Sequence, residues 1–570
     1  MAVYWITEAL PVGVTALLPV FFFPIFQIVN SNEIAAQYMN DINMLFLGGL
    51  IMATAIEYWE LHRRVALGVL MIVGTEPKWL MLGMMLATWF LSMWISNTAT
   101  TAMMIPIADA VLVQLKGSAS KQKGQGEVDV KIVEESNGRT GEELFSKTGG
   151  SPDVQHKPQI SIKAPPDPLA PEVEAAPEVD DPAYANMGKA MSLCICYAAT
   201  CGGIACLTGT GPNLAFKAHA DYVYAQYGLN NPVTFGNWMA FGIPLSLLTL
   251  FVCWAWLLIA FLRCRGACGC CSATKHDAGQ AKRIKQVIRD EYAKLGPLVF
   301  GQLAIIFLFV ALVTLWITRD LGGVTGWGTS FNMPVKDGAV AMLIAVLLFA
   351  VPSTLPFLKS YSDPAHPEKW AKKEISNTAK QETIRFGPIE VRPLLNWKVT
   401  HEKLPWHLFL LLGGGYALSK GCEKSGLSSW IGHQLEFFTD WNQWGIIFII
   451  GYITAAATEV TSNTAIATLL LPIMSQLAIN TGVHPLYYML PTALASSFAF
   501  MLPVATPPNA IVFAYGRITI ADMAKIGFVL NILAIPCLVA VIGTIGDALY
   551  DFDNIPVEFL KKNLTTLAKI

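Results

Sequence analysis

Long apolar segments recur along the whole chain of 570 residues, and they limit what it can fold into. A helix needs about 20 mostly apolar residues to cross the hydrocarbon of a bilayer. Only 14% of the residues are charged, against about 25% in soluble domains. The pattern predicts an all-α polytopic membrane protein and excludes an ordinary soluble enzyme, and the net charge of −2 argues against nucleic-acid binding. The predicted crossings are 8–29, 42–60, 188–226, 236–262, 298–318, 337–353, 404–422, 485–515 and 523–548.

Charged residues gather in three segments between the apolar ones. Residues 116–187 hold 13 acidic residues and 8 prolines with almost no aromatic residues, which predicts a disordered loop. Residues 263–296 and 354–403 are basic, and 280–295 fits an amphipathic surface helix. Basic loops face the cytoplasm, and an even number of crossings separates the three segments, so we expect all three inside. The C-terminus then lies outside, where Asn563 is a predicted glycosylation site.

Four cysteines follow the predicted crossing 236–262. With only 11 cysteines in the chain, a disulfide scaffold is excluded. Palmitoylation is the first interpretation of these four, a metal site is the second, and plain reduced thiols are a third. They are Cys264, Cys268, Cys270 and Cys271.

An internal repeat divides the chain into two related halves. Residues 96–107 match residues 462–473 at six of twelve positions, and both begin with Ser-Asn-Thr. The spacing from this motif to the next matching asparagine is 116 residues in the first half and 46 in the second. The excess of 70 residues is close to the length of the acidic loop, which we interpret as an insertion in one copy. Further pairs in the same order are 45–49 with 410–414 and 208–213 with 504–509.

Each Ser-Asn-Thr lies in the middle of an apolar segment, 80–114 in one half and 441–478 in the other. Each segment is about long enough for two short helices, and Ser, Asn and Thr suit helix N-caps. We therefore predict two re-entrant hairpins with the motif at the tip. Gly and Pro in 209–212 and 507–508 predict helices that are broken in mid-span. The crossing count gives the hairpins opposite orientations, and inverted repeats with broken helices indicate a secondary transporter.

The tips and breaks offer hydroxyls, amides and backbone groups, and they contain no Lys, Arg or His. Helix N-termini and side-chain donors bind carboxylates and similar anions. A dianion in a low-dielectric site needs countercharge, however, and oxygen ligands at a broken helix suit Na⁺. Symport of an anion with Na⁺ is the hypothesis, although the composition alone fits a neutral substrate too.

Each candidate residue also has a purely structural interpretation. Asparagine in a membrane helix more often joins helices than binds a ligand, and Gly48-Gly49 more often indicates close helix packing. We interpret Glu459 as the buried partner of a lysine rather than as a catalytic group. The same structural interpretation, in ion pairs or near interfaces, applies to Asp109, Lys217 and Lys420.

Three stretches resemble the signatures of the divalent anion–sodium symporters: 91–104, 208–213 and 496–512. The likeness is greatest to animal Na⁺/dicarboxylate and Na⁺/citrate cotransporters, and it runs from Met1 to about residue 560 apart from the acidic loop. It implies a homodimeric elevator in the plasma membrane that imports succinate-like di- or tricarboxylates with Na⁺. The implied partners are the dicarboxylate, Na⁺, a second copy and membrane lipids, with no organic cofactor and no nucleic acid.

The resemblance also implies the binding residues. The third position of the second tip, Thr464, resembles dicarboxylate carriers, because the citrate-preferring member has Val there and sulfate-type relatives show Pro in that tip. The first Na⁺ site would contain Ser96, Asn97, Thr208, Gly209, Gly211 and Asn213, and the second Thr461, Asn463, Ala505 and Asn509. The substrate would contact Ser96, Asn97, Thr98, Pro212, Ser462, Asn463, Thr464 and Thr506.

The same resemblance divides the chain into a scaffold and a transport domain. The family has eleven spans, and we expect this sequence to lack the first and most of the second. The expected scaffold is 1–79 and 298–440, with a cytoplasmic loop at 354–404. The expected transport domain is hairpin 80–115, 188–263 and 441–548, and the remaining segments are the cytoplasmic loops 116–187 and 264–297 and the extracellular tail 549–570.

A citrate-preferring or a sulfate carrier is the alternative within the same class. An anion channel or a membrane-bound enzyme is the alternative of another class. The enzyme is disfavoured because the sequence shows no phosphate-binding loop, no His-Glu-x-x-His and no His/Cys metal spacing in the crossings. The channel is disfavoured because it calls for a continuous pore rather than two inverted hairpins.

Overall fold

The computed structural model is built of helices, with one short β-hairpin among the residues that it describes. Those residues are 1–123 without 8 and 74–75; 182–262; 278–354 without 321–325, 332 and 334; 384–427 without 387–388; 430; 434; and 441–559. The predicted all-α class is confirmed, and the segment predicted as the loop 354–404 adds one short hairpin. Strands β1 (Ile384–Phe386) and β2 (Ile389–Val391) pair there in antiparallel register.

The first half of the chain runs from α1 to α11. Its elements are α1 (Ala2–Thr7), α2 (Val12–Thr15), α3 (Leu18–Ile25), α4 (Ser31–Ala35), η1 (Ala36–Met39), α5 (Asp41–Tyr58), α6 (Leu61–Ile72), α7 (Pro77–Ser92), α8 (Asn97–Lys123), α9 (Pro182–Ala205), α10 (Gly211–Gln226), α11 (Phe235–Leu257) and the π-helical η2 (Leu258–Leu262).

The second half begins with α12, which confirms the helix predicted over 280–295. Its elements are α12 (Ala278–Ala293), α13 (Phe300–Arg319), η4 (Trp327–Thr329), α14 (Asp337–Ala350), α16 (Trp397–Lys403), α17 (Trp406–Lys424), α19 (Gln443–Thr458), α20 (Asn463–Asn480), α21 (Pro485–Ala495), α22 (Pro507–Ala514), α23 (Ile520–Val541), the π-helical η6 (Ile542–Gly546) and α24 (Asp547–Tyr550).

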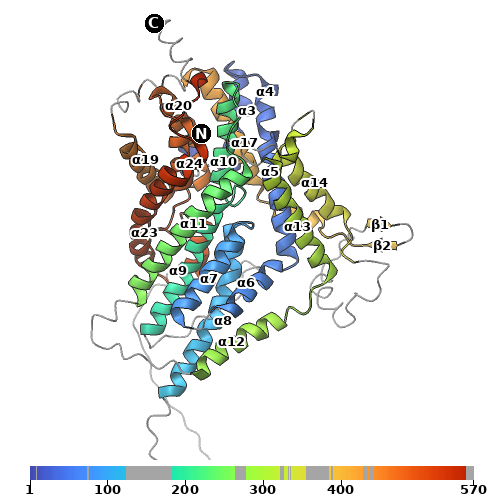
Figure 1. Ribbon diagram of the computed structural model, residues 1–570, viewed down its shortest axis with the longest axis vertical. Helices are drawn as coiled ribbons and strands as arrows, with labels where there is room; N and C mark the ends of the chain where they lie inside the picture. The colour runs from blue at the N-terminus through green and yellow to red at the C-terminus, as the bar shows by residue number, and fades with distance from the viewer. Residues whose placement is uncertain are drawn as a thin grey trace, which may run out of the picture.

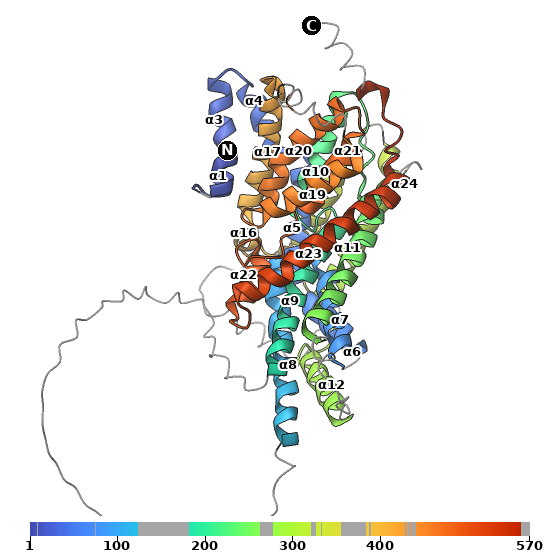
Figure 2. The same cartoon turned by 90° about the vertical axis from the view of Figure 1, so that its left-hand side faces the viewer.

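Within the described residues, six helical segments are long and apolar enough to cross a membrane. They are Ser31–Tyr58, Ala185–Ala205, Phe235–Phe261, Phe300–Arg319, Asn463–Asn480 and Ile520–Tyr550. Figure 1 shows α6, α7, α8 and α12 at one end of the bundle and α3, α4, α17 and α20 at the other, and Figure 2 shows the same division from the side.

The predicted boundaries are wrong in three places. The predicted crossing 8–29 is divided into α2 and α3, because Pro19, at the second position of α3, has no N–H to continue the helix from α2. The acidic loop is shorter than 116–187, since α8 continues to Lys123 and α9 begins at Pro182. Helix α6 was not predicted, because its 12 residues are too short for a crossing and include His62, Arg63 and Arg64.

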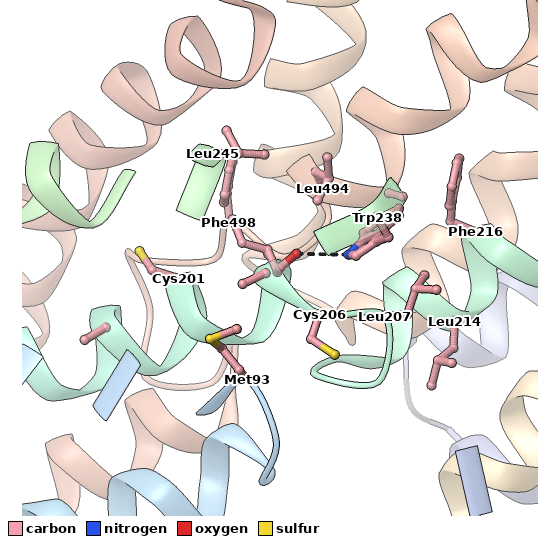
Figure 3. Packing of buried hydrophobic residues seen from close by; sticks show 14 of the residues in the cluster. Met93, Cys201, Cys206, Leu207, Leu214, Phe216, Trp238, Leu245, Leu494 and Phe498 are labelled. Atoms are coloured by element: carbon pink, nitrogen blue, oxygen red, sulfur yellow. Dashed lines mark hydrogen bonds between the residues drawn. The ribbon is translucent and has the colours of Figure 1, made fainter. Parts of the chain in front are cut away.

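The two halves share one buried core. Figure 3 shows side chains from both halves packed together, among them Met93, Cys206, Trp238 and Phe498. The dashed line in that view is the hydrogen bond from Trp238 Nε1 to the carbonyl oxygen of Ile204, 3.3 Å long. This core surrounds the places where α9 and α10, and α21 and α22, are separated by non-helical backbone.

Candidate functional site

Both Ser-Asn-Thr motifs interrupt a pair of helices, as predicted. Helix α7 ends at Ser92 and α8 begins at Asn97, while α19 ends at Thr458 and α20 begins at Asn463. The backbone N–H groups of the first helical turn have no partner within the helix, so each tip presents donors and the positive end of a helix dipole. In the first tip the Ser96 hydroxyl accepts one of these, the N–H of Ala99, at 3.2 Å.

The tip asparagine is held in the same way in both halves, by a hydroxyl that the sequence analysis missed. Ser92 Oγ lies 2.6 Å from Asn97 Oδ1 and 2.8 Å from the carbonyl oxygen of Ala199. The equivalent group is Thr458 Oγ1, which lies 2.7 Å from Asn463 Oδ1 and 2.7 Å from the carbonyl oxygen of Ser496. The two pairs are equivalent, since an offset of 366 residues separates both the hydroxyls (458 − 92) and the asparagines (463 − 97).

Each of these hydroxyls has one proton to donate, yet two acceptor oxygens lie within hydrogen-bond distance of it. Rotating the asparagine amide by 180° gives the hydroxyl one donor and one acceptor: the amide nitrogen donates to the hydroxyl, and the hydroxyl donates to the backbone carbonyl oxygen. We assign this orientation to Asn97 and Asn463. It turns the amide oxygen of each tip asparagine away from Ser92 and Thr458 respectively, where it is free to accept.

The asparagines of the two helix breaks are also equivalent. Asn213 Nδ2 donates to the carbonyl oxygens of Gly203 and Cys206, at 3.0 and 2.8 Å. Asn509 Nδ2 donates to the carbonyl oxygens at the matching positions, Ala499 and Leu502, at 3.0 Å each. These bonds close the non-helical turn before α10 and α22.

The oxygens of the same two amides have no hydrogen-bond partner among the residues that the structure describes. Asn213 is fully buried and Asn509 is 1% exposed, and this holds for Oδ1 of each. A buried acceptor without a partner is costly, so each oxygen calls for a cation or a donor. The residues around the two breaks therefore fit a hard cation that is bound by amide, hydroxyl and carbonyl oxygens.

The tips and the breaks lie against each other. A Cβ added to Gly203 would lie 2.8 and 2.9 Å from the two terminal amide atoms of Asn97, so the first tip lies directly on α9. A Cβ added to Gly211 would lie 2.2 Å from Thr464 Oγ1, so the second tip touches the break of the first half. The two halves are joined again where the Tyr197 hydroxyl donates to the carbonyl oxygen of Phe500, at 3.0 Å.

The remaining predicted site residues occupy the same region. The Thr208 hydroxyl contacts the Cys206 thiol at 3.3 Å, and the Thr506 hydroxyl accepts from the N–H of Asn509 at 3.4 Å. The Thr461 hydroxyl donates to the carbonyl oxygen of Trp5, at 3.1 Å. Pro212 begins α10 next to Gly211, Gly209 packs against the carbonyl of Gly203, and Ala505 precedes α22. In the tips Ser96 and Thr98 are exposed, Ser462 is half-buried and Thr464 is buried.

Glu459 distinguishes the second half from the first. Its carboxylate accepts the backbone N–H groups of Phe500, Met501 and Leu502, at 2.8 to 3.1 Å, and the amide of Asn531 at 2.7 Å. The predicted lysine partner is therefore wrong, because these partners are backbone and amide donors. The equivalent position of the first half is Met93, so only the second break is held by a carboxylate.

The structural interpretations of Gly48, Asp109, Lys217 and Lys420 are confirmed. Gly48 packs closely, since an added Cβ would lie 2.6 Å from Ala341. Asp109 pairs with Arg517, Lys217 with Asp221, and Lys420 with Glu33 and Glu423. Asn563 and the four cysteines Cys264, Cys268, Cys270 and Cys271 lie outside the described residues.

Comparison with known proteins gives a consistent result over nearly the whole chain. Residues 1–551 match the family model of the sodium:sulfate symporter transmembrane region. The chain is 43% identical to the Na⁺/citrate cotransporter of Rattus norvegicus, over 98% of this chain and 91% of that protein. It is 41% identical to human solute carrier family 13 member 2, over 98% and 89%, and 39% identical to human Na⁺/dicarboxylate cotransporter 3, over 100% and 90%. The chain therefore belongs to the sodium:sulfate symporter family.

Proposed function

We propose that this protein is a Na⁺-coupled symporter that imports succinate-like di- or tricarboxylates across the plasma membrane. Its relatives include Na⁺/citrate and Na⁺/dicarboxylate cotransporters. The observation that carries the proposal is a pair of buried amide oxygens, on Asn213 and Asn509, that lack a hydrogen-bond partner in the described part of the chain and lie at equivalent positions of the two halves. Two equivalent oxygen sites favour two bound cations.

The first Na⁺ ion is proposed to lie between the first tip and the first break, and the second between the second tip and the second break. Support comes from the short distances between these elements and from the free oxygens of the tip asparagines. To the residues that the sequence predicts we add Ser92 and Thr458, which orient those asparagines. The two sites then contain Ser92, Ser96, Asn97, Thr208, Gly209, Gly211 and Asn213, and Thr458, Thr461, Asn463, Ala505 and Asn509.

The substrate is proposed to bind between the two tips. Helix N-termini and hydroxyls there donate to carboxylates, and the approach of Thr464 to Gly211 brings the second tip to the first break. Because no cationic side chain lies in the tip or break sequences, the Na⁺ ions supply the countercharge. The residues proposed to contact the substrate are Ser96, Asn97, Thr98, Pro212, Ser462, Asn463, Thr464 and Thr506.

Movement of a transport domain, formed by both hairpins with α9–α11 and α20–α23, is proposed to carry the site across the membrane. The remaining helices are proposed as the scaffold of a homodimer. The similar order of helix, tip and helix in the two halves supports a duplicated unit, and opposite orientation of the copies is part of the proposal. The basic loops are proposed to face the cytoplasm and the C-terminus the outside.

Uptake by proteoliposomes tests this function. We expect succinate uptake to need Na⁺ and to be reduced at least ten-fold in Asn213→Ala and Asn509→Ala, because each loses the buried oxygen. Asn442→Ala, which changes a cap at the exposed start of α19, is the matched control. Uptake that continues without Na⁺ would exclude symport. Competition with citrate and sulfate identifies the substrate, and dominance of sulfate would favour the second candidate, which the family description suggests.

A further inference from the structure

A cavity of about 450 Å³ lies between α6, α8 and α12, apart from the tips and the breaks. Its volume is in the range of ligand sites. Figure 1 shows these three helices together at one end of the bundle. One face of α8 forms its longest wall, with side chains three or four residues apart: Met103, Pro106, Ile107, Ala110 and Val111. Leu67 of α6 and Ile288 of α12 extend this apolar wall.

The charged groups of the cavity come from α6, from Glu60 immediately before it, and from α12. Arg63 Nη2 donates to Glu291 Oε2 at 2.8 Å, and Lys294 pairs with the same carboxylate. Arg64 is occupied at the end of α12, where it donates to the carbonyl oxygens of Leu295 and Gly296 at 2.9 Å. These contacts hold α12 against α6, and they neutralise the negative charge of Glu291.

Glu60 is different from Glu291. It lines the same cavity, and its carboxylate has neither a hydrogen bond nor an ion pair with any described residue. The backbone of Glu60, the residue before α6, has a φ of 52°. This lies in the left-handed region, which residues other than glycine rarely adopt. Among the described residues of the lining, Glu60 is thus the carboxylate without a hydrogen bond or an ion pair, and the His62 ring, also in the lining, lies with Nδ1 3.3 Å from the carbonyl oxygen of Ile56. The lining also carries one guanidinium, Arg63, with donors left over after its bond to Glu291.

The surroundings of the cavity are those of a membrane interface. Val65 of α6 and Val113 of α8 are 38% and 59% exposed beside the lining residues, and in a membrane transporter such apolar side chains face lipid. Helix α12 buries Ile288 and exposes Lys285 and Arg289, which is the pattern of an amphipathic helix that lies along the bilayer surface. The cavity therefore borders both hydrocarbon and headgroup regions.

We propose that this cavity binds a phospholipid with a primary amine in its headgroup. The ammonium group donates to Glu60, the phosphate accepts from the free donors of Arg63, and an acyl chain lies along the apolar face of α8. A primary ammonium has three hydrogens to donate, whereas a choline headgroup of the same charge has none. The site therefore prefers phosphatidylethanolamine to phosphatidylcholine. Because α8 starts at the first tip, the lipid supports the helix that carries Asn97.

Photolabelling of the purified full-length protein tests this site. Photoreactive phosphatidylethanolamine and phosphatidylcholine with identical acyl chains are compared, and labelled peptides are identified by mass spectrometry. We expect phosphatidylethanolamine to label α8 or α12 several-fold more strongly. Glu60→Gln should abolish that preference, while Glu76→Gln, which changes an exposed carboxylate paired with Lys78, should keep it.

A second pair of variants tests the cavity itself. Ala110→Trp fills the space beside α8, and we expect it to lose most labelling by both lipids. Val113→Trp adds the same side chain to the same helix at an exposed position and should label like the wild type. Equal labelling by the two lipids in the wild type, an unchanged preference in Glu60→Gln, or full labelling of Ala110→Trp would each overturn the proposal. These readouts measure binding alone, so they stay separate from the outcome of the uptake experiment.

Discussion

At the residue scale, the orientation of the tip asparagines depends on one hydroxyl in each half. Without Ser92 or Thr458 the amide loses the group that fixes its rotation, and its oxygen no longer points consistently to the proposed Na⁺ site. One net hydrogen bond contributes about 0.5–1.5 kcal/mol, which corresponds to a change of roughly two- to ten-fold in affinity. We expect Ser92→Ala and Thr458→Val each to raise the half-saturating Na⁺ concentration by that factor.

The chain offers its own controls for this prediction. Ser92→Thr and Thr458→Ser exchange the hydroxyl residues of the two halves and keep the hydrogen bonds to Asn97 and Asn463. Both exchanges should retain a Na⁺ dependence close to that of the wild type. The Na⁺ dependence of succinate uptake is the measurement, and normal Na⁺ dependence in both hydroxyl-free variants would refute the assigned amide orientation.

A second prediction concerns the carboxylate of Glu459. In Glu459→Gln one acceptor oxygen is replaced by an NH₂ group that faces the N–H donors of Phe500 to Leu502. Loss of charge-assisted hydrogen bonds in a buried place should lower the free energy of unfolding by about 2–3 kcal/mol. Thermal unfolding in detergent measures this. Glu57→Gln removes the half-exposed pair with Lys403 and should change stability by less than about 1 kcal/mol. Equal effects of the two variants would contradict the role given to Glu459.

The sequence predicts some of these residues and misses others for a physical reason. Asn97, Asn213, Asn463 and Asn509 are found because each recurs in the other half beside a Gly, Pro or Ser that breaks a helix. Ser92 was missed, as was its partner in the other half, because a hydroxyl inside an apolar helix can bond its own backbone and needs no other role. The available signal was a hydroxyl five residues before the tip asparagine in both copies.

At the element scale, the close approach of the second tip to the first break leads to a further prediction. Gly211→Ala would place a Cβ 2.2 Å from Thr464 Oγ1, and Thr464 is buried, so the tip has to move away from α10. We expect the maximal uptake rate to fall by at least ten-fold while the protein still folds. Gly445→Ala is the matched control, because nothing lies within 4 Å of its added Cβ in α19. A normal rate in Gly211→Ala would show that this contact is not needed for transport.

Elements were predicted best where length and helix breakers agree. The tips and breaks are at the predicted positions because Ser, Asn, Gly and Pro end or start helices by local chemistry. The sequence does not predict helix α6, because the helix is too short to be recognised as a crossing. Tertiary contacts stabilise it instead, including those of Arg64 with the end of α12. Pro19 is visible in the sequence and explains the division of the first crossing, because it lies at the start of α3.

At the scale of the whole molecule, the proposed division into two domains cuts through one buried hydrogen-bond chain. The Ser475 hydroxyl of α20 donates to the carbonyl oxygen of Pro472, so it accepts from His219 Nε2 of α10, at 2.8 Å. The other ring nitrogen, Nδ1, then accepts from the Ser419 hydroxyl of α17, at 3.0 Å. Of these two contacts, the one with Ser475 stays within the proposed transport domain, and the one with Ser419 joins it to the proposed scaffold.

This pair of contacts gives a direct test of the domain division, because a thiol and an imidazole together bind Zn²⁺. In Ser419→Cys, micromolar Zn²⁺ would tie His219 to α17, and we expect succinate uptake to stop and to recover when a chelator is added. In Ser475→Cys the same metal would join two helices that move together, so uptake should fall much less. The wild type controls for the native cysteines. The two metal bridges differ in effect only if α17 and α10 move relative to each other. If Zn²⁺ blocks uptake by Ser475→Cys as strongly as by Ser419→Cys, or blocks neither, the boundary between scaffold and transport domain does not lie between α17 and α10.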